Sequence, residues 1–328
     1  MLTTAEERLL IHKVWSEWPR IRKTIYERLG INNTEDLISA IKADIITANR
    51  FVNIIMNEVG LTANKNKIDK NIRLISIFDK DYPQELLNMQ KINEKIYPPL
   101  LLYMLTLLNE PIFNKKPIIS IVGTRQCTNK GARMAYDIAK RLSRDYIIAS
   151  GLAKGIDYHA TQGTLDSNGT IIEVRPYLLP IDYVNSNEYE RILKHGCIIS
   201  ENLKKIDSKS WINMNLYLRN RIIAGIAKAV VVVEARARKG SGSMHQIEFA
   251  LKRGKPVFVW KIEEKGEEYG GRGGEIDNEL IAGYKEYKAN KGVKEFTTVD
   301  ELVRLIDIEI KRSAHHQHPA QRRIDTPY

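Results

Sequence analysis

The sequence predicts an α/β protein with a parallel sheet flanked by helices, preceded by a small helical domain. Between residues 118 and 260, short runs rich in β-branched residues alternate with helical patterns, which is typical of a buried parallel sheet. From about Thr4 to Leu61, leucines and isoleucines instead recur at three-to-four spacing, which indicates amphipathic helices. The polar residues from Thr62 to Lys70 are expected to link the two parts.

These patterns divide the chain into a helical region at 1–65, an α/β domain at 72–302, and a last segment at 303–328. The last ordered element is expected near Val299 to Ile310, and the basic tail after it, with His315 and His316, has too few apolar residues to pack. The expected strands of the central domain are 118–122, 146–150, 170–174, 197–200, 229–233 and 256–259.

Composition narrows the classes of partner and compartment. The 328 residues include 51 Lys and Arg against 40 Asp and Glu, and the net charge of +11 favours a polyanionic partner. Cys127 and Cys197 are far apart and outside any Cys-x-x-Cys motif, which argues against a disulfide framework or zinc site and fits a reducing cytoplasm. The longest apolar stretch, Pro98 to Leu108, is too short to cross a bilayer.

Three loops that follow expected strands carry glycines and cations suited to an anion. Ligands bind beyond the carboxyl ends of parallel strands, where glycines allow close approach and helix amino termini attract anions. An arginine can add bidentate contacts to a phosphate, and a lysine can add a point charge. The candidates in these loops are Gly123, Thr124 and Arg125, then Gly151 and Lys154, then Ser241 and Gly242.

A fourth candidate segment, Arg219-Asn220-Arg221, precedes the fifth expected strand. Ile222, Ile223 and Ile226 would face the core while the arginines reach the same rim as the loops. The alternative is a surface helix with solvated arginines. For Asp157, which follows the second loop, the expected role is to cap the next helix.

Motifs of the common enzyme classes are missing from the sequence. The first expected strand is not followed by Gly-x-Gly-x-x-Gly, and no Gly-x-x-x-x-Gly-Lys-[Ser/Thr], Gly-x-Ser-x-Gly or His-Glu-x-x-His occurs. The residues therefore predict no catalytic centre, no cofactor and no metal site.

Four segments in order resemble the DNA-processing protein A (DprA/Smf) family: IVGTRQCTNKG, SGLAKGID, RNRIIAGIAKAVVVVEA and SGSMHQIEFALKRGKPVFVW. Upstream, Phe78 to Leu87 is similar to the family's Asp-x-x-Tyr-Pro-x-x-Leu element, and downstream Asn278 to Gly283 is similar to its Asn-x-Leu-Ile-x-x-Gly element. The likeness extends from about Ile72 to Leu302.

The resemblance implies an extended Rossmann-like domain whose basic pocket grips single-stranded DNA, protects it, and assists loading of a RecA-type recombinase during uptake or repair. It further implies a cytoplasmic homodimer without catalytic activity. The family's DNA-binding positions correspond to Gly123, Thr124, Arg125, Gly151, Lys154, Arg219, Asn220, Arg221, Ser241 and Gly242.

The chain departs from the family pattern at several positions. The family's histidine after Gly-Ile-Asp is displaced by two residues, to His159, and the aromatic residue ahead of Arg-Asn-Arg is replaced by Leu216. The Gly-rich turn after the third expected strand is replaced by Arg175-Pro176-Tyr177. Tyr177, Tyr183 and Tyr217 are the candidates to stack on bases instead.

Two other functions use the same kind of pocket. One is a nucleotide-binding or N-glycoside-cleaving enzyme of the lysine-decarboxylase-like (LOG) type, whose Pro-Gly-Gly-x-Gly-Thr-x-x-Glu motif is matched here only by Lys239 to Ser243 with Glu248 further on. The other is a sensor of a small nucleotide in a defence system.

Overall fold

The computed structural model describes residues 71–76, 79–87, 98–99, 101–181, 185–205, 207–236, 242–263, 278 and 293–316. Nine strands form one sheet in the order β1-β2-β6-β5-β4-β3-β7-β8-β9. The strands from β6 to β9 in this order are parallel, whereas β2 is antiparallel to both β1 and β6. The strands are β1 Ile72–Ser76, β2 Leu101–Leu105, β3 Ile118–Val122, β4 Ile147–Ser150, β5 Ile171–Val174, β6 Gly196–Ser200, β7 Ala229–Val232, β8 Val257–Trp260 and β9 Val293–Phe296.

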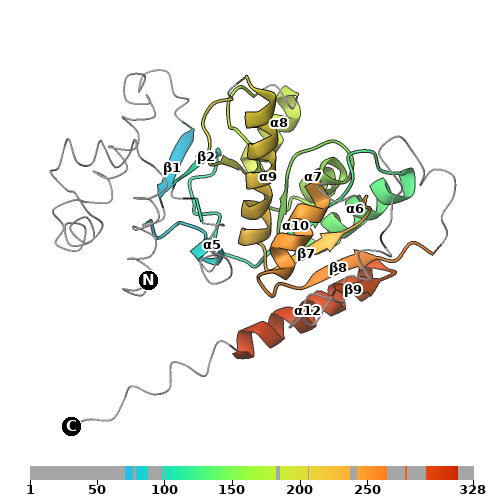
Figure 1. The fold of residues 1–328 in the computed structure, drawn as a ribbon. Coiled ribbons are helices and arrows are strands. Elements are labelled where there is room, and N and C mark those ends of the chain that lie inside the picture. The colour runs from blue at the N-terminus through green and yellow to red at the C-terminus, as the bar shows by residue number, and fades with distance from the viewer. Residues whose placement is uncertain are drawn as a thin grey trace, which may run out of the picture.

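Helices cover both faces of this sheet (Figure 1). One layer contains α9 and α10, which pack together, with α5 against α9. The other contains α6, α7 and α8, with α12 packed against β9 and α6. The helices are α5 Gln84–Leu87, α6 Asn129–Leu142, α7 Ile156–Asp166, α8 Ser186–His195, α9 Lys209–Ile226, α10 Gly242–Leu251 and α12 Val299–His316.

The predicted α/β class is confirmed, and the six expected strands correspond to β3 through β8. They were identifiable because each is a buried apolar run: every residue of β3, for example, is buried. The apolar stretch from Pro98 to Leu108 supplies β2, which the sequence did not separate from other apolar segments. No helix within the described ranges is long and apolar enough to span a bilayer.

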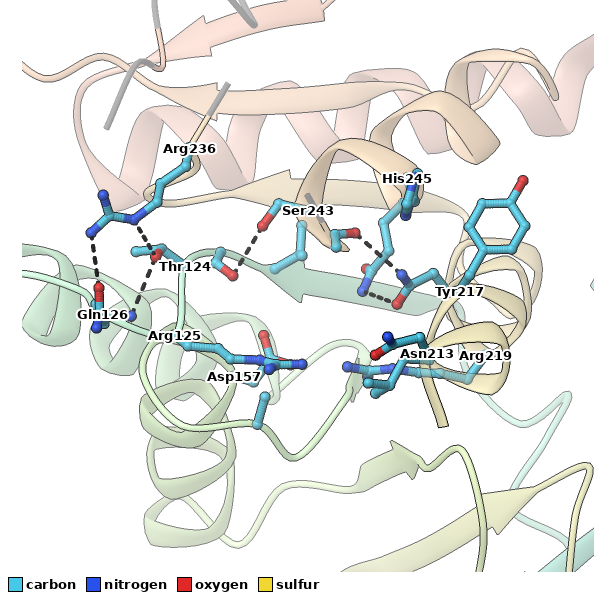
Figure 2. Close-up of a pocket in the computed structure, with 17 residues that line it drawn as sticks. Thr124, Arg125, Gln126, Asp157, Asn213, Tyr217, Arg219, Arg236, Ser243 and His245 are labelled. Atoms are coloured by element: carbon cyan, nitrogen blue, oxygen red, sulfur yellow. Dashed lines mark hydrogen bonds between the residues drawn. The ribbon is translucent and has the colours of Figure 1, made fainter. Parts of the chain in front are cut away.

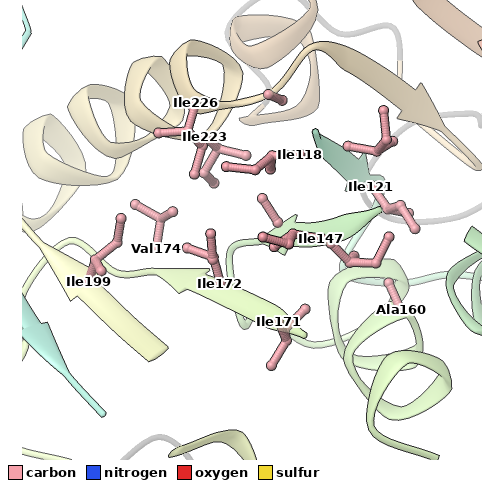
Figure 3. Packing of buried hydrophobic residues seen from close by; sticks show 14 of the residues in the cluster. Ile118, Ile121, Ile147, Ala160, Ile171, Ile172, Val174, Ile199, Ile223 and Ile226 are labelled. Carbon is pink, nitrogen blue, oxygen red and sulfur yellow. The ribbon is translucent and has the colours of Figure 1, made fainter. Parts of the chain in front are cut away.

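The main core lies between the sheet and the α9 layer and between the sheet and the α7 layer (Figure 3). Ile222, Ile223 and Ile226 are at most 1% exposed, which confirms that this face of α9 packs inward. Burying each such side chain stabilises the fold by roughly 1.5–3 kcal/mol. The packed isoleucines hold the end of α9 in place, so Arg219 and Arg221, which come just before them in the helix, have fixed positions.

The carboxyl-terminal helix is longer than expected. α12 continues past Ile310 to His316, so His315 and His316 belong to a helix and not to a tail. Buried Leu302 and Ile306 anchor its first turns, and Glu309 then pairs with Lys294 and Arg312; together these contacts favour further helical turns. The expected helical region at 1–65, the linker, the helix after Asn278 and the chain beyond 316 lie outside the described residues.

Candidate functional site

A cavity of about 630 Å³ opens at the carboxyl edge of the sheet. It lies where the direction of the chain through the sheet reverses: β3 is followed by α6 and β4 on one side, and β7 is followed by α10 and β8 on the other. Such a switch point leaves a crevice between diverging loops. The cavity is lined by the loops after β3 and β7, by the β4–α7 junction and by one side of α9.

Three arginines approach this cavity from different elements. Arg125 follows β3, Arg219 lies in α9 and Arg236 follows β7. In Figure 2 the guanidinium groups of Arg125 and Arg219 point toward each other across the pocket. Among the described lining residues the only carboxylate is Asp157, so the pocket is electropositive.

The guanidinium of Arg219 packs directly against Gly151. It is 7% exposed, and a Cβ on Gly151 would lie 1.5 Å from its Nη1, so only glycine leaves room for the guanidinium. Nη1 donates to the carbonyl of Val174 at 3.4 Å, while Nε has no hydrogen-bond partner within the described part of the chain. Burial lowers the pKa of Arg219 to about 10, and Asp157 partly opposes this. The side chain is therefore charged at neutral pH, with donor capacity to spare.

Asp157 organises the second loop from the first turn of α7. Its carboxylate accepts hydrogen bonds from the backbone of Ala153 and Gly151. Burial raises its pKa, and the charge of Arg219 acts in the opposite direction. The expected role as a cap of α7 is wrong, because the cap position is Gly155, without a side-chain hydrogen bond, and Asp157 instead fills the loop that was expected to hold an external anion.

A second carboxyl group lies beneath Arg219. Glu173 in β5 is inaccessible to solvent, and burial raises its pKa to about 8. Thr161, at the position of the family's histidine, donates a hydrogen bond to it. Arg175, from the turn that departs from the family pattern, donates to the Leu152 carbonyl at 3.0 Å and so supports the second loop. A protonated Glu173 leaves the charge of Arg219 available to a ligand.

The amino terminus of α6 is already occupied by a carboxylate. The backbone and hydroxyl groups of Thr128 donate to Glu234 at 2.9 and 2.6 Å, and Gly131 gives this carboxylate room, since a Cβ there would lie 2.2 Å from it. Glu234 reaches this helix end from just after β7, 106 residues along the chain. The Gly131 N–H donates to the hydroxyl oxygen of Thr128 at 3.0 Å, so the amides of Thr128 and Gly131 are not left for the external anion that was expected there.

The third loop forms a chain of hydrogen bonds at the start of α10. Asn220 donates through Nδ2 to the carbonyl of Gly242 at 3.3 Å, and Gln246 donates through Nε2 to Oδ1 of Asn220 at 3.3 Å. Ser243 donates to the carbonyl of Gly123 at 3.0 Å and thereby joins the first loop to α10. All five residues line the pocket.

Arg221 does not reach the pocket, contrary to expectation. Its Nη2 lies 2.8 Å from each carboxylate oxygen of Glu201, and Arg221 is absent from the lining. Successive helical residues are about 100° apart, so Arg219 and Arg221 leave α9 in nearly opposite directions. The buried isoleucines fix which of the two faces the cavity.

The other predicted residues are distributed unevenly. Thr124, Arg125, Asn220 and Gly242 line the pocket with Gly123, as expected. Lys154 is exposed and outside the lining. Ser241 lies outside the described residues.

Of the three candidate aromatic residues, Tyr217 lines the pocket. It is 37% exposed and meets His245 edge to face, with 4.7 Å between the ring centroids. Tyr177 is 9% exposed, packs near Trp211 and is not in the lining. Tyr183 lies outside the described residues.

Arg236, His245 and Gln246 are lining residues that the sequence did not identify. Arg236 donates to Oγ1 of Thr124 and to Oε1 of Gln126, both at 3.3 Å. Arg236 comes just after the apolar run of β7, and ligands bind beyond the carboxyl ends of parallel strands, so its position in the sequence could have identified it. His245 and Gln246 lie inside a helix, where only the phase of α10 directs them to the cavity.

The family model of DNA recombination-mediator protein A matches residues 73–303. A DNA processing protein DprA from Streptococcus pneumoniae is 34% identical over 190 residues, which cover 56% of this chain and 61% of the relative. DNA processing protein DprA of Bacillus subtilis is 31% identical over 198 residues, covering 58% and 61%. The chain thus spans about three fifths of the length of these two relatives.

Solved structures agree on the fold. The structure of DprA from Streptococcus pneumoniae superposes with a TM-score of 0.60 at 23% identity, covering 93% of this chain and 98% of that one. DNA processing protein A from Helicobacter pylori, described for its mode of binding single-stranded DNA, gives a TM-score of 0.54 at 20% identity, covering 73% and 96%.

Proposed function

Because this chain belongs to the DNA recombination-mediator protein A family, we propose that it binds single-stranded DNA in the pocket at the carboxyl edge of its sheet. The observation that carries the proposal is the buried guanidinium of Arg219, which faces Arg125 across the cavity and keeps Nε without a partner among the described residues. A DNA phosphate is an acceptor that fits such donors.

The shape of the pocket favours a flexible strand over a duplex. Arg219 lies 7% exposed at the cavity wall, so a phosphate must enter the crevice to reach it. A single strand can bend its backbone inward, whereas the phosphates of a rigid duplex meet only the rim. Tyr217, exposed beside the pocket, supplies a ring on which a base can stack.

The binding roles that we propose differ among the predicted residues. Arg125 and Arg219 contact phosphates, while Gly123, Thr124, Asn220 and Gly242 shape the wall. Ser241 stays a predicted DNA contact. Gly151 makes room for Arg219. Lys154 attracts the strand at the rim, and Arg221 positions the end of α9 through Glu201.

We propose further that the chain is not an enzyme, and that it protects the strand and assists loading of a RecA-type recombinase as a cytoplasmic homodimer. Burial and the nearby Glu234 raise the pKa of the Cys127 thiol, which disfavours a nucleophilic thiolate. Asp157 is engaged by backbone amides and Arg219, which disfavours a general base. The proposals of recombinase loading and of a homodimer rest on the family resemblance.

The test is a binding titration of the purified chain at one salt concentration. A labelled single strand, the same sequence as a duplex, and nucleoside monophosphates are compared, and release of free base from the monophosphates is assayed in parallel. We expect the single strand to bind most tightly and no base to be released. Equal affinity for the duplex would contradict the proposal, and release of base would favour the LOG-type enzyme.

A further inference from the structure

Gln246 contributes an unsatisfied acceptor to the wall of the pocket. The carbonyl of Gly242 can only accept, so Asn220 must direct Nδ2 toward it and Oδ1 toward Gln246. Gln246 must then direct Nε2 toward Asn220. This chain of hydrogen bonds fixes both amide orientations and leaves Oε1 of Gln246 as the free end.

That oxygen has no donor in the described part of the chain. Gln246 is 3% exposed, and its Oε1 is buried without a hydrogen-bond partner. A buried acceptor without a donor costs free energy in the unbound protein, and a ligand that offers a donor would recover it. Gln246 lines the same cavity as Arg125 and Arg219.

The chemistry of DNA limits what this donor can be. Phosphates and deoxyribose rings within a strand offer only acceptor oxygens, which suit the arginines but not Gln246. The N–H groups of the bases are the only donors in the strand. Building on the proposed function, we propose that Gln246 accepts a hydrogen bond from a base N–H and thereby determines which base edge the pocket prefers.

The neighbouring side chains fit this arrangement. Tyr217 and His245 line the same cavity, and the tyrosine ring is held by Phe249 with 5.3 Å between centroids. A base directed at Gln246 would therefore lie near an aromatic edge. The pocket would then discriminate a base from a missing base and one base edge from another, which phosphate contacts alone do not.

The experiment compares two strands on three proteins. The homopolymer that binds most tightly is compared with the same strand in which every base N–H is replaced by N–methyl. This change keeps the rings and phosphates but removes all donors of the bases. The proteins are the wild type, Gln246→Met, and Gln126→Met as the matched control. Gln126 also lines the pocket, but its Oε1 already accepts from Arg236 at 3.3 Å.

Methylation should weaken binding to the wild type by about three- to tenfold, the contribution of one neutral hydrogen bond. Gln246→Met should bind both strands equally, and Gln126→Met should discriminate as the wild type does. Equal binding of both strands by the wild type, or undiminished discrimination in Gln246→Met, would overturn the proposal. If Gln246→Met does not fold, the ratio of the affinities of the wild type for the two strands decides: a ratio near one would overturn the proposal. Failure of the wild type to bind either strand at low salt would instead overturn the proposed function itself.

Discussion

The end of α9 presents two arginines to two different environments. Arg219 enters a cavity, where its Nε has no partner among the described residues and the nearby Glu173 has a pKa of about 8. Arg221, two residues on, meets both oxygens of Glu201 at 2.8 Å and donates to the carbonyl of Leu218. The first guanidinium has one donor atom without a partner in the described part of the chain, which under the proposed function serves a ligand, and the second is paired with a carboxylate of the fold.

The surroundings of Arg221 extend this contrast. Lys255 donates to the carbonyls of Ala224, Gly225 and Ala227 at the end of α9, and Lys228 pairs with Glu85. Burial lowers the pKa of Lys255 to about 7. Both sides of α9 are rich in cations, so positive charge alone does not identify a binding site. What distinguishes the pocket is a cavity combined with the Nε donor of Arg219, which has no hydrogen-bond partner among the described residues.

The largest expected effect is the loss of binding in Arg219→Gln. Removing a buried cation from a charge-assisted contact costs about 2–5 kcal/mol, so affinity for a single strand should fall about a hundredfold. Fluorescence anisotropy at fixed salt measures this. Circular dichroism provides the control for folding, and near wild-type affinity in a folded variant would remove Arg219 from the contact.

Arg221→Gln should give the opposite result. Breaking a largely buried ion pair leaves Glu201 without its guanidinium, and the free energy of unfolding should fall by about 2 kcal/mol. Affinity for a single strand, measured where the variant is folded, should remain within about twofold of the wild type. A hundredfold loss of affinity with unchanged stability would place Arg221 at the DNA instead.

Salt dependence separates Arg125 from Lys154. Each phosphate neutralised on a single strand contributes about 0.7 to the slope of log affinity against log salt, so Arg125→Ala should flatten that slope by about 0.7. Lys154→Ala should do the same only if the strand continues across the rim, because Lys154 lies outside the lining. An unchanged slope in folded Arg125→Ala would exclude a phosphate contact there.

The buried Glu173 predicts a pH dependence of stability. Its folded pKa of about 8 lies above the ordinary value of 4.5, so the folded state keeps a proton that the unfolded chain loses. The resulting stabilisation is fully present below the unfolded pKa and disappears as the pH rises through about 8. Glu173→Gln mimics the neutral form, so its unfolding free energy should fall less between about pH 5 and pH 8, by about 1 kcal/mol or more. Parallel denaturation curves for the two proteins at both pH values would contradict this.

Cys127→Ser should have the smallest effect. The thiol lies in the first loop but is not among the lining residues, and its raised pKa disfavours the thiolate. The side chain is half-buried against the main core, so the change to a serine hydroxyl is expected to act on stability, but affinity for a single strand should stay within about twofold of the wild type, a difference below about half a kcal/mol. Loss of a measurable catalytic activity in this variant would contradict a purely binding role.

The parallel core was predictable because local patterns determine it. In runs such as Ile118–Val122, the residues on both faces of the strand are buried. This pattern is typical of a parallel sheet that is covered by helices on both sides. β1 and β9 did not stand out in the same way, because they are edge strands and carry polar residues such as Arg73 and Glu295. Edge strands need not be apolar on both faces.

The site was predictable to the level of loops but not of individual partners. Strand ends located Arg125 and Gly242 correctly. Two carboxylates accept hydrogen bonds from the first two loops. Glu234, which follows β7, accepts from Thr128, and Asp157 accepts from the backbone of Ala153 and Gly151 earlier in the chain. Glu201 likewise forms an ion pair with Arg221. Such pairings depend on packing in three dimensions, which no spacing rule contains.

The most direct test of the central claim is to locate the bound strand. A single strand carrying a photoactivatable thymidine analogue is crosslinked to the wild-type chain, and the modified peptides are identified by mass spectrometry. We predict crosslinks within α9 near the exposed Tyr217 and within α10 near the half-buried His245, both of which line the pocket, and their loss in Arg219→Gln. Crosslinks confined to surfaces away from the pocket, unchanged in Arg219→Gln, would contradict the account.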